Sequence, residues 1–204
     1  MSTLLSTLTE QGWPGSVAVV DGAGSSVTQN LVLGKAEYIK SDRGRGLQIA
    51  RGLSRDQEWL LILHADSEIT TEMRDELADV LKGPPSWGRF NVSIPGLPVI
   101  AMSMNWRSRL TKICTGDQGM FFHQDLLDEF PDQPLMEDIE LSKRLKRRHS
   151  EKFVPLKSFI STSPRRWQQR GVVRTIITMW SYRIRYYLGT SAETLYAEYY
   201  QRNE

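Results

Sequence analysis

Short apolar runs that end in polar residues alternate with segments long enough for helices, and this alternation constrains the fold more than any other feature. Three such runs stand early in the chain, at Ser16–Val20, Ala36–Ile39 and Trp59–Leu63. Strands that alternate with helices are typical of an α/β domain, and near-continuous apolar strands favour a sheet that is covered on both faces. We therefore predict a three-layer α/β/α domain, with helices flanking a mixed, mostly parallel central sheet.

The rest of the chain continues the pattern. Further strands are predicted at Phe90–Ile94, Met120–Phe122 and Phe153–Ile160. Helices are predicted at Leu4–Thr9, Ser26–Gly34, Gly46–Arg55, Thr71–Leu81, Ile100–Ile113, Met136–Arg148, Gly171–Leu188 and Ala192–Tyr200. Because no internal repeat, low-complexity tract or linker interrupts them, residues 1–204 are predicted to form one domain, with a C-terminal helical segment at 171–200.

The composition is that of an ordinary globular protein, with 40% hydrophobic and 25% charged residues. The lone cysteine, Cys114, cannot form an intrachain disulfide, which fits a reducing cytoplasm. The first residues lack the pattern of a secretory signal, and no apolar run reaches the ~18–20 residues of a membrane span. We therefore expect a cytoplasmic protein, with attachment to the inner face of the membrane as an alternative.

Basic residues are concentrated in one stretch. Between Lys143 and Arg185 there are thirteen Lys or Arg residues and one acid, Glu151, although the net charge of the chain is only +2. Such a stretch is either a solvated basic face or a region of positive potential that attracts an anionic partner, such as a diphosphate or a phospholipid surface. No recognised nucleic-acid-binding motif accompanies it, so nucleic acid is not the expected partner.

Each of the three early strands ends in polar or charged residues. Asp21 ends the first, Arg43 and Arg45 follow the second, and His64 and Asp66 follow the third. The carboxyl ends of parallel strands meet at one edge of the sheet, where ligands of open α/β sheets bind. A carboxylate there suits Mg²⁺ or Mn²⁺, which binds one or two carboxylates together with substrate phosphates. Alternatively, Asp66 caps the helix that follows and His64 is a satisfied polar residue.

Two loops could shape the binding pocket. Arg43 and Arg45 stand beside a predicted helix start with Gln48 one turn further on, which suits a diphosphate cradle, although a mobile basic loop would have the same sequence. Asp117 and Gln118 lie in a polar turn between apolar residues, which is either part of a pocket or a plain turn before the next strand.

Two further groups could take part in catalysis. Glu137 and Asp138 open an amphipathic helix, where acids favour the helix dipole, but one carboxylate could instead act as a general base. Arg165, Arg166 and Trp167 combine two guanidiniums with an aromatic plane, which suits a departing diphosphate and a stacked sugar or base. Alternatively, Trp167 is a core residue and the arginines lie on the surface.

In order, these pieces resemble the family 2 glycosyltransferases with the GT-A fold, and in particular the subgroup called selenodomain-associated transferase 2. The matching stretches are Val20-Asp21-Gly22, Arg43-Gly44-Arg45 through Gln48, Leu63-His64-Ala65-Asp66, Gly116-Asp117-Gln118-Gly119, Pro134-Leu135-Met136-Glu137-Asp138 and Arg165-Arg166-Trp167. No single stretch is decisive, and the resemblance depends on their order.

The resemblance implies a GT-A-like fold and metal-dependent, inverting transfer of a hexosyl or related group from a nucleotide-diphosphate sugar to an acceptor, either a lipid or a small molecule. It implies that Asp21 contacts the nucleotide, that Asp66 and His64 match the metal-binding motif, and that Asp138 is the catalytic base. The arginine–tryptophan element would lie near the donor diphosphate or the acceptor.

The chain departs from the family pattern at its start. The family has one more strand ahead of Ser16, and here Leu4–Thr9 resembles the helix that follows that strand. A non-catalytic protein that kept the fold but lost part of its donor site is therefore the alternative prediction.

The segment Gly171–Leu188 carries an apolar stripe with interspersed arginines. We expect this helix to pack on the domain with its arginines extended to solvent. Contact with an anionic membrane surface and a homodimer contact are the alternatives.

Overall fold

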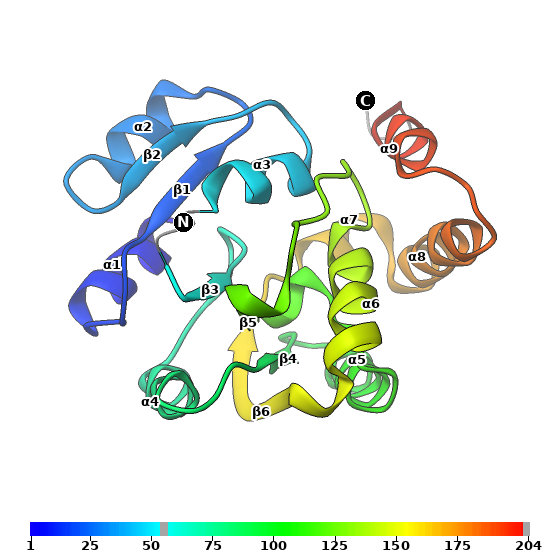
Figure 1. The fold of residues 1–204 in the computed structure, drawn as a ribbon. Coiled ribbons are helices and arrows are strands. Elements are labelled where there is room, and N and C mark those ends of the chain that lie inside the picture. Colours follow the sequence, from blue (N-terminus) through cyan, green and yellow to red (C-terminus); the bar gives the residue numbers. More distant parts are fainter. Residues whose placement is uncertain (54–56, 202–204) are drawn as a thin grey trace.

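The structure, a computed structural model, describes residues 1–53 and 57–201, including every side chain in those ranges except those of Arg166 and Gln201. Its helices are α1 (Ser2–Glu10), α2 (Ser26–Val32), α3 (Arg45–Gly52), α4 (Thr71–Leu81), α5 (Pro98–Thr111), α6 (Glu137–His149), α7 (Arg165–Arg170), α8 (Val172–Tyr187) and α9 (Ala192–Gln201). Its strands are β1 (Ala18–Asp21), β2 (Glu37–Lys40), β3 (Trp59–Ile62), β4 (Trp87–Ser93), β5 (Met120–His123) and β6 (Phe153–Ser161). The chain is thus an α/β protein in which strands and helices alternate (Figure 1).

The described strands form two sheets. β1 and β2 pair in parallel, and a separate four-stranded sheet has the order β3-β5-β4-β6. In that sheet β5 is antiparallel to β3 and β4, whereas β4 and β6 are parallel. The prediction of a mixed, mostly parallel central sheet is therefore confirmed only in part: the pairing is mixed, but the described strands form two sheets and two of their four pairings are antiparallel. The sequence pattern identifies strands, but it carries no information about which strand edges pair.

Helix α3 connects the two sheets. The side-chain amide of Gln48 donates to the carbonyl oxygen of Val20 in β1 at 3.0 Å. On the other side of the helix, Ile49 and Ala50 pack against the core of the four-stranded sheet. Gly52 is needed for this approach, since a Cβ there would lie 2.5 Å from the side chain of Val20. The residues that follow β1 and β2 are thereby held beside the larger sheet.

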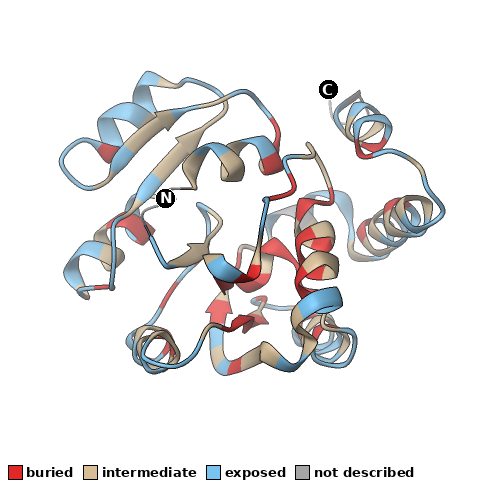
Figure 2. Cartoon of the chain, viewed as in Figure 1, coloured by how far each residue is buried: buried red, intermediate tan, exposed pale blue. Residues whose placement is uncertain are grey.

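Successive residues of β5 point to opposite faces of the four-stranded sheet, as the pleat requires. Phe121 packs in one core cluster with Met73 of α4, whereas Phe122 packs in another with Leu141 and Leu145 of α6. Figure 2 shows buried residues gathered on this sheet and on α6, whereas α2 is mostly exposed. The predicted apolar stripe of α6 is confirmed, because Ile139, Leu141 and Leu145 are all buried.

A bulge in β6 is closed by a side chain of α4. The register between β4 and β6 shifts between Arg89 and Asn91, which leaves backbone groups of β6 without ladder partners. The carboxylate of Glu76 accepts hydrogen bonds from the backbone N–H groups of Lys157 and Ser158, both at 2.8 Å. These bonds hold the pKa of Glu76 below its usual value, although partial burial acts in the opposite direction.

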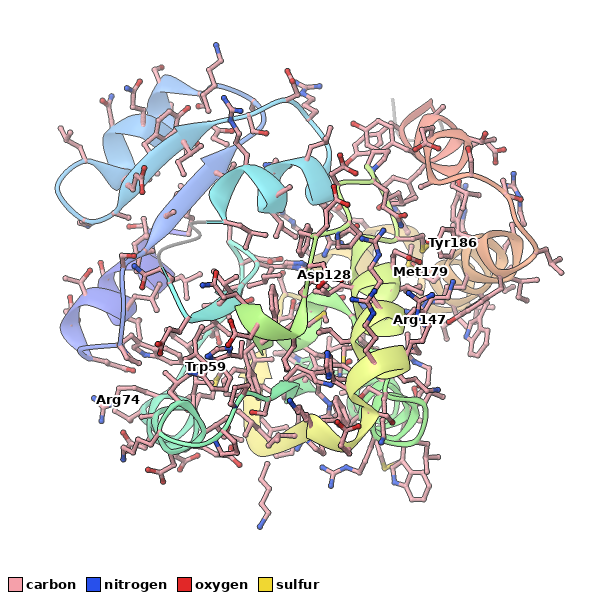
Figure 3. All side chains as sticks on the ribbon, viewed as in Figure 1. Trp59, Arg74, Asp128, Arg147, Met179 and Tyr186 are labelled. Atoms are coloured by element: carbon pink, nitrogen blue, oxygen red, sulfur yellow. The ribbon has the colours of Figure 1, made fainter. Side chains whose placement is uncertain are left out.

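The two C-terminal helices attach to the start of α6. Tyr182 and Leu195 are buried with Ile139, and the hydroxyl of Tyr186 donates to Glu140 at 3.0 Å (Tyr186 is labelled in Figure 3). One apolar face of α8 is exposed to solvent, with the following side chains exposed: Val173, Ile177, Trp180, Ile184 and Tyr187. The expectation that this helix packs on the domain is confirmed, and Tyr182 and Tyr186 rather than the exposed side chains provide the contact.

Among the residues that the structure describes, no helix has both the length and the apolar character that crossing a membrane requires.

Candidate active site

Four of the predicted site residues form one polar chain, although they come from four different segments. His64 follows β3, Arg45 begins α3, Glu137 begins α6, and Asp117 lies in the short 3-10 helix η1 (Gly116–Gln118). A terminal nitrogen of the Arg45 guanidinium contacts Nε2 of His64, and Nε of Arg45 lies 3.0 Å from Oε1 of Glu137. On its other side, Nδ1 of His64 lies 3.1 Å from Oδ1 of Asp117.

These contacts fix the tautomer of His64. A guanidinium can only donate hydrogen bonds, so Nε2 of His64 is the acceptor and the ring proton sits on Nδ1. That proton points to the carboxylate of Asp117. Both ring nitrogens are therefore engaged by protein groups, and neither is left to bind a metal ion in this arrangement.

Of the two acids in this polar chain, Glu137 is the more deeply buried, with 1% of its surface exposed. Burial raises the pKa of its carboxyl to about 7, the guanidinium of Arg45 opposes that rise, and the nearby charge of Asp138 adds to it. Oε1 of Glu137 has no aligned hydrogen-bond partner among the described residues, so its contact with Arg45 is an ion pair with poor hydrogen-bond geometry. Glu137 thus positions Arg45 and faces the interior.

Asp138 is held differently, by backbone groups alone. Its Oδ2 accepts a hydrogen bond from the N–H of Gly116 at 3.0 Å, and its Oδ1 accepts one from the N–H of Ile139 at 2.7 Å. An ionised carboxylate can accept about four hydrogen bonds, so two positions are left for other donors. Asp138 is half-buried, unlike Glu137, and it lies next to the cavity, behind the lining residues Thr115 and Asp117, rather than in the lining itself.

The backbone is strained just before these acids. Met136 adopts a left-handed conformation with φ 62°, which is uncommon for a residue other than glycine. Its side chain is buried in the cluster that contains Tyr182 and Leu195, and this burial stabilises the turn. The turn lets Glu137 and Asp138 begin α6 directly after a bend of the chain.

Gly116 leaves room for the whole arrangement. A Cβ at this position would lie 2.5 Å from Nε2 of His64 and even closer to the guanidinium of Arg45, nearer than real Cβ atoms approach. Glycine therefore lets η1 pack against both side chains, in the positions that they occupy here, while its N–H reaches Asp138.

A cavity of about 530 Å³ opens beside this polar chain. His64, Asp66 and Asp117 line one part of it, and Arg165 and Trp167 of α7 line another. Side chains of α5 and α8 complete the wall; one of them, Met179, is labelled in Figure 3. The structure thus brings together five predicted site residues that are spread over about a hundred positions of the sequence.

Other predicted site residues lie outside the cavity lining, and two of them stabilise the local fold. The carboxylate of Asp21 accepts hydrogen bonds from the backbone N–H groups of Ala23 and Ser25, both at 2.8 Å, and closes the turn after β1. These bonds and one from Tyr38 keep the pKa of Asp21 below its usual value, although burial alone would raise it. Gln48 is bound to β1, as described above, and Arg43 lies beside Gly22 rather than in the cavity lining.

Gln118 is fully buried, and its side chain forms hydrogen bonds that hold the loop in place. Its amide nitrogen donates to Ser108 at 2.9 Å, and its amide oxygen accepts from the N–H of Thr115 at 3.2 Å. Gln118 therefore shapes η1 and does not line the cavity. The side chain of Arg166 lies outside the described part of the structure.

Of the two predicted metal ligands, only Asp66 is placed to bind a divalent cation. Among the described residues, no group of three His, Cys, Asp or Glu side chains is arranged to hold a metal ion. Asp66 is exposed at the cavity and can offer a carboxylate, whereas His64 is engaged at both nitrogens. Asp66 together with the phosphates of a substrate is the donor set that Mg²⁺ commonly uses.

Sequence reasoning did not identify two cavity residues, Arg107 of α5 and Arg183 of α8. A signal was present in the helical spacing. Arg107 follows Ile100 and Met104 on one helix face, and Arg183 follows Ile176 and Met179 in the same way. In each helix an arginine continues an apolar, inward-facing stripe, which is an unusual place for a cation.

Comparison of the chain with protein-family models, with curated proteins and with solved structures finds no match. Its function is therefore inferred from the geometry of the cavity together with the order of the motifs in the sequence.

Proposed function

We propose that the chain is a glycosyltransferase of the GT-A type, which moves a sugar from a nucleotide-diphosphate sugar to an acceptor with inversion. The observation that carries the proposal is the convergence of Asp66, Trp167 and Arg165 on one cavity, with Asp138 held beside it through Gly116. Those residues belong to distant motifs of the sequence, and each has a defined part in such a reaction.

Asp138 is the proposed base. The acceptor hydroxyl donates its hydrogen bond to a carboxylate oxygen of Asp138, which removes the proton as the oxygen attacks the anomeric carbon. The bond between that carbon and the diphosphate oxygen then breaks on the opposite side, and the nucleoside diphosphate leaves. The two backbone hydrogen bonds to Asp138 fix the direction of the carboxylate without neutralising it.

The leaving diphosphate requires positive charge. Arg165 lines the cavity with an exposed guanidinium, and Trp167 beside it offers a plane on which a sugar or base can stack. Asp66 would hold Mg²⁺ or Mn²⁺, which when bound stabilises the charge of the departing diphosphate. Arg45, in contrast, forms an ion pair with Glu137 and contacts His64, so we assign it a positioning role.

A non-catalytic nucleotide-binding protein is the second candidate, and the break between the two sheets favours it. Among the described strands, β1 pairs only with β2 and β3 pairs only with β5, so the sheet edge that carries Asp21 is separate from the one that carries His64. A donor site that extends across both edges would be incomplete at this break.

Calorimetric titration with a panel of nucleoside diphosphates, with Mn²⁺ and with a chelator, tests the proposal. We expect one nucleotide to bind in the micromolar range only when the metal is present, and the corresponding sugar nucleotide to release nucleoside diphosphate over time. Binding without release, in the presence of varied acceptors, would favour the non-catalytic candidate. No binding of any nucleotide would overturn both.

A further inference from the structure

Two arginines of the cavity wall face the same space from neighbouring helices. Arg107 of α5 and Arg183 of α8 both line the cavity, and neither forms an ion pair with a described acidic side chain. Nη1 of Arg107 donates to the carbonyl oxygen of Ile113 at 3.2 Å. Its Nη2 is buried and has no hydrogen-bond partner among the described residues.

This arrangement is costly without a further partner. A buried donor that lacks an acceptor destabilises a fold, and a buried cation does so more strongly. Burial and the like charge of Arg183 lower the pKa of Arg107 to about 10, and the charge of Asp138 opposes that decrease. Two like charges that share a cavity indicate an anion that binds between them.

We propose that Arg107 and Arg183 form a subsite for an oxyanion, a phosphate or a carboxylate, that belongs to the acceptor substrate. The oxyanion would accept from the guanidinium groups of Arg107 and Arg183, which both line the cavity. The assignment to the acceptor rests on the proposed function, whereas the anion subsite itself does not.

The surroundings of the pair support the acceptor over the donor. Nη1 of Arg107 donates to the carbonyl oxygen of Ile113, three residues before the Gly116 that binds Asp138, so the subsite lies near the proposed base, where the acceptor must bind. Arg165, Trp167 and Asp66 already provide for the donor. Ile100, Met104, Ile176 and Met179 line the same cavity, and such a wall suits an acid that has an apolar body.

Binding of inorganic phosphate without metal tests the subsite directly. We expect phosphate to bind the wild-type chain in calorimetry and to raise its unfolding temperature. The substitution Arg183→Gln should weaken phosphate binding about ten- to a hundredfold, the range expected for one lost charge-assisted hydrogen bond. In the absence of phosphate the same variant should be at least as stable as the wild type, because a like-charge repulsion is removed.

Matched controls separate this effect from a general loss of positive charge. Arg174→Gln lies on the same helix as Arg183, and Arg109→Gln lies on the same helix as Arg107; both residues are exposed and outside the cavity lining. Both control variants should bind phosphate like the wild type, whereas Arg107→Gln should bind it weakly. Acetate, titrated in parallel, shows whether a carboxylate serves as well as a phosphate.

The subsite is wrong if phosphate does not bind, or if Arg183→Gln and Arg174→Gln change its binding equally. If phosphate binding depends on Arg183 but no nucleotide binds, the subsite stands and the sugar-transfer proposal fails. If a nucleotide binds with Mn²⁺ while phosphate binding does not depend on Arg183, the subsite fails and the donor site stands. Displacement of phosphate by a saturating nucleoside diphosphate would overturn the assignment to the acceptor.

Discussion

The backbone N–H of Gly116 donates to Oδ2 of Asp138 at 3.0 Å, and this bond connects two motifs that lie twenty-two positions apart in the sequence. Through it, the loop that carries Asp117 is fixed against the first turn of α6. Because Asp117 in turn contacts His64 at the end of β3, the proposed base has a defined position relative to the cavity. The predictions for Asp138 and Gly116 depend on this connection.

Replacing Asp138 by Asn should abolish transfer and leave donor binding near the wild-type level. An amide cannot accept the proton of the acceptor hydroxyl, and loss of a general base typically costs about 10²–10⁴-fold in rate. Steady-state kinetics and nucleotide titration on the same preparation measure the two effects. Transfer at the wild-type rate by Asp138→Asn would remove Asp138 as the base, and Glu72→Gln, at an exposed acid outside the cavity lining, serves as the control.

Replacing Gly116 by Ala should disrupt the polar chain. The new methyl group would overlap Nε2 of His64 and the guanidinium of Arg45, so either η1 or these two side chains have to move, and contacts of the polar chain are lost. Such overpacking costs about 1–3 kcal/mol of unfolding free energy and should also weaken nucleotide binding. Urea unfolding and calorimetry check these results. An unchanged stability would mean that the loop does not pack against Arg45 and His64 as described.

Much of the secondary structure could be predicted from local signals. The helix Thr71–Leu81 is confirmed at both ends, because Thr70 caps its first turn and Gly83 with the two following prolines prevents its continuation. The strands followed from their apolar runs. Helix α7 (Arg165–Arg170) was missed, since its six residues lack apolar periodicity and follow directly after a proline.

Other features could not be predicted because they depend on contacts between distant segments. The division into two sheets is a property of strand pairing, and the exposed stripe of α8 reflects attachment through Tyr182 and Tyr186. Within the site, the sequence predicted which residue types gather at the strand ends. It could not show that the amide of Gln118 forms hydrogen bonds with Thr115 and Ser108 rather than with a ligand, or that Arg107 lines the cavity.

The stability of the chain should depend on pH through Glu76. Its pKa is lowered in the folded state, so the stabilisation from its ionised form is present above the ordinary pKa of 4.5 and is lost as the pH falls through the folded value. Glu76→Gln should be less stable than the wild type by about 1–2 kcal/mol at pH 7, because hydrogen bonds to a charged acceptor are lost. The difference should decrease as the pH falls below 4.5 and through the lowered pKa of the folded state. A difference that is constant with pH, measured by chemical unfolding, would contradict this role of Glu76.

In the two C-terminal helices, a substitution at a buried position should lower the unfolding free energy much more than one at an exposed position. Leu195→Ala removes a fully buried side chain that packs with Ile139 and should cost about 2–5 kcal/mol. Ile177→Ser alters an exposed position and should change the unfolding free energy by no more than about 0.5 kcal/mol. Denaturant unfolding of both variants measures the contrast. A large loss for Ile177→Ser would show that the stripe of α8 is covered.

The central claim is that the cavity holds the diphosphate of a nucleotide sugar through a metal at Asp66. The most direct test compares the affinity for the preferred nucleoside diphosphate with Mn²⁺ and with a chelator, in the wild type, in Asp66→Ala and in Glu72→Ala, an exposed acid outside the cavity. We predict that Mn²⁺ strengthens binding by about tenfold or more in the wild type and in Glu72→Ala, and has no effect in Asp66→Ala. The same Mn²⁺ dependence in Asp66→Ala as in the wild type would contradict the claim.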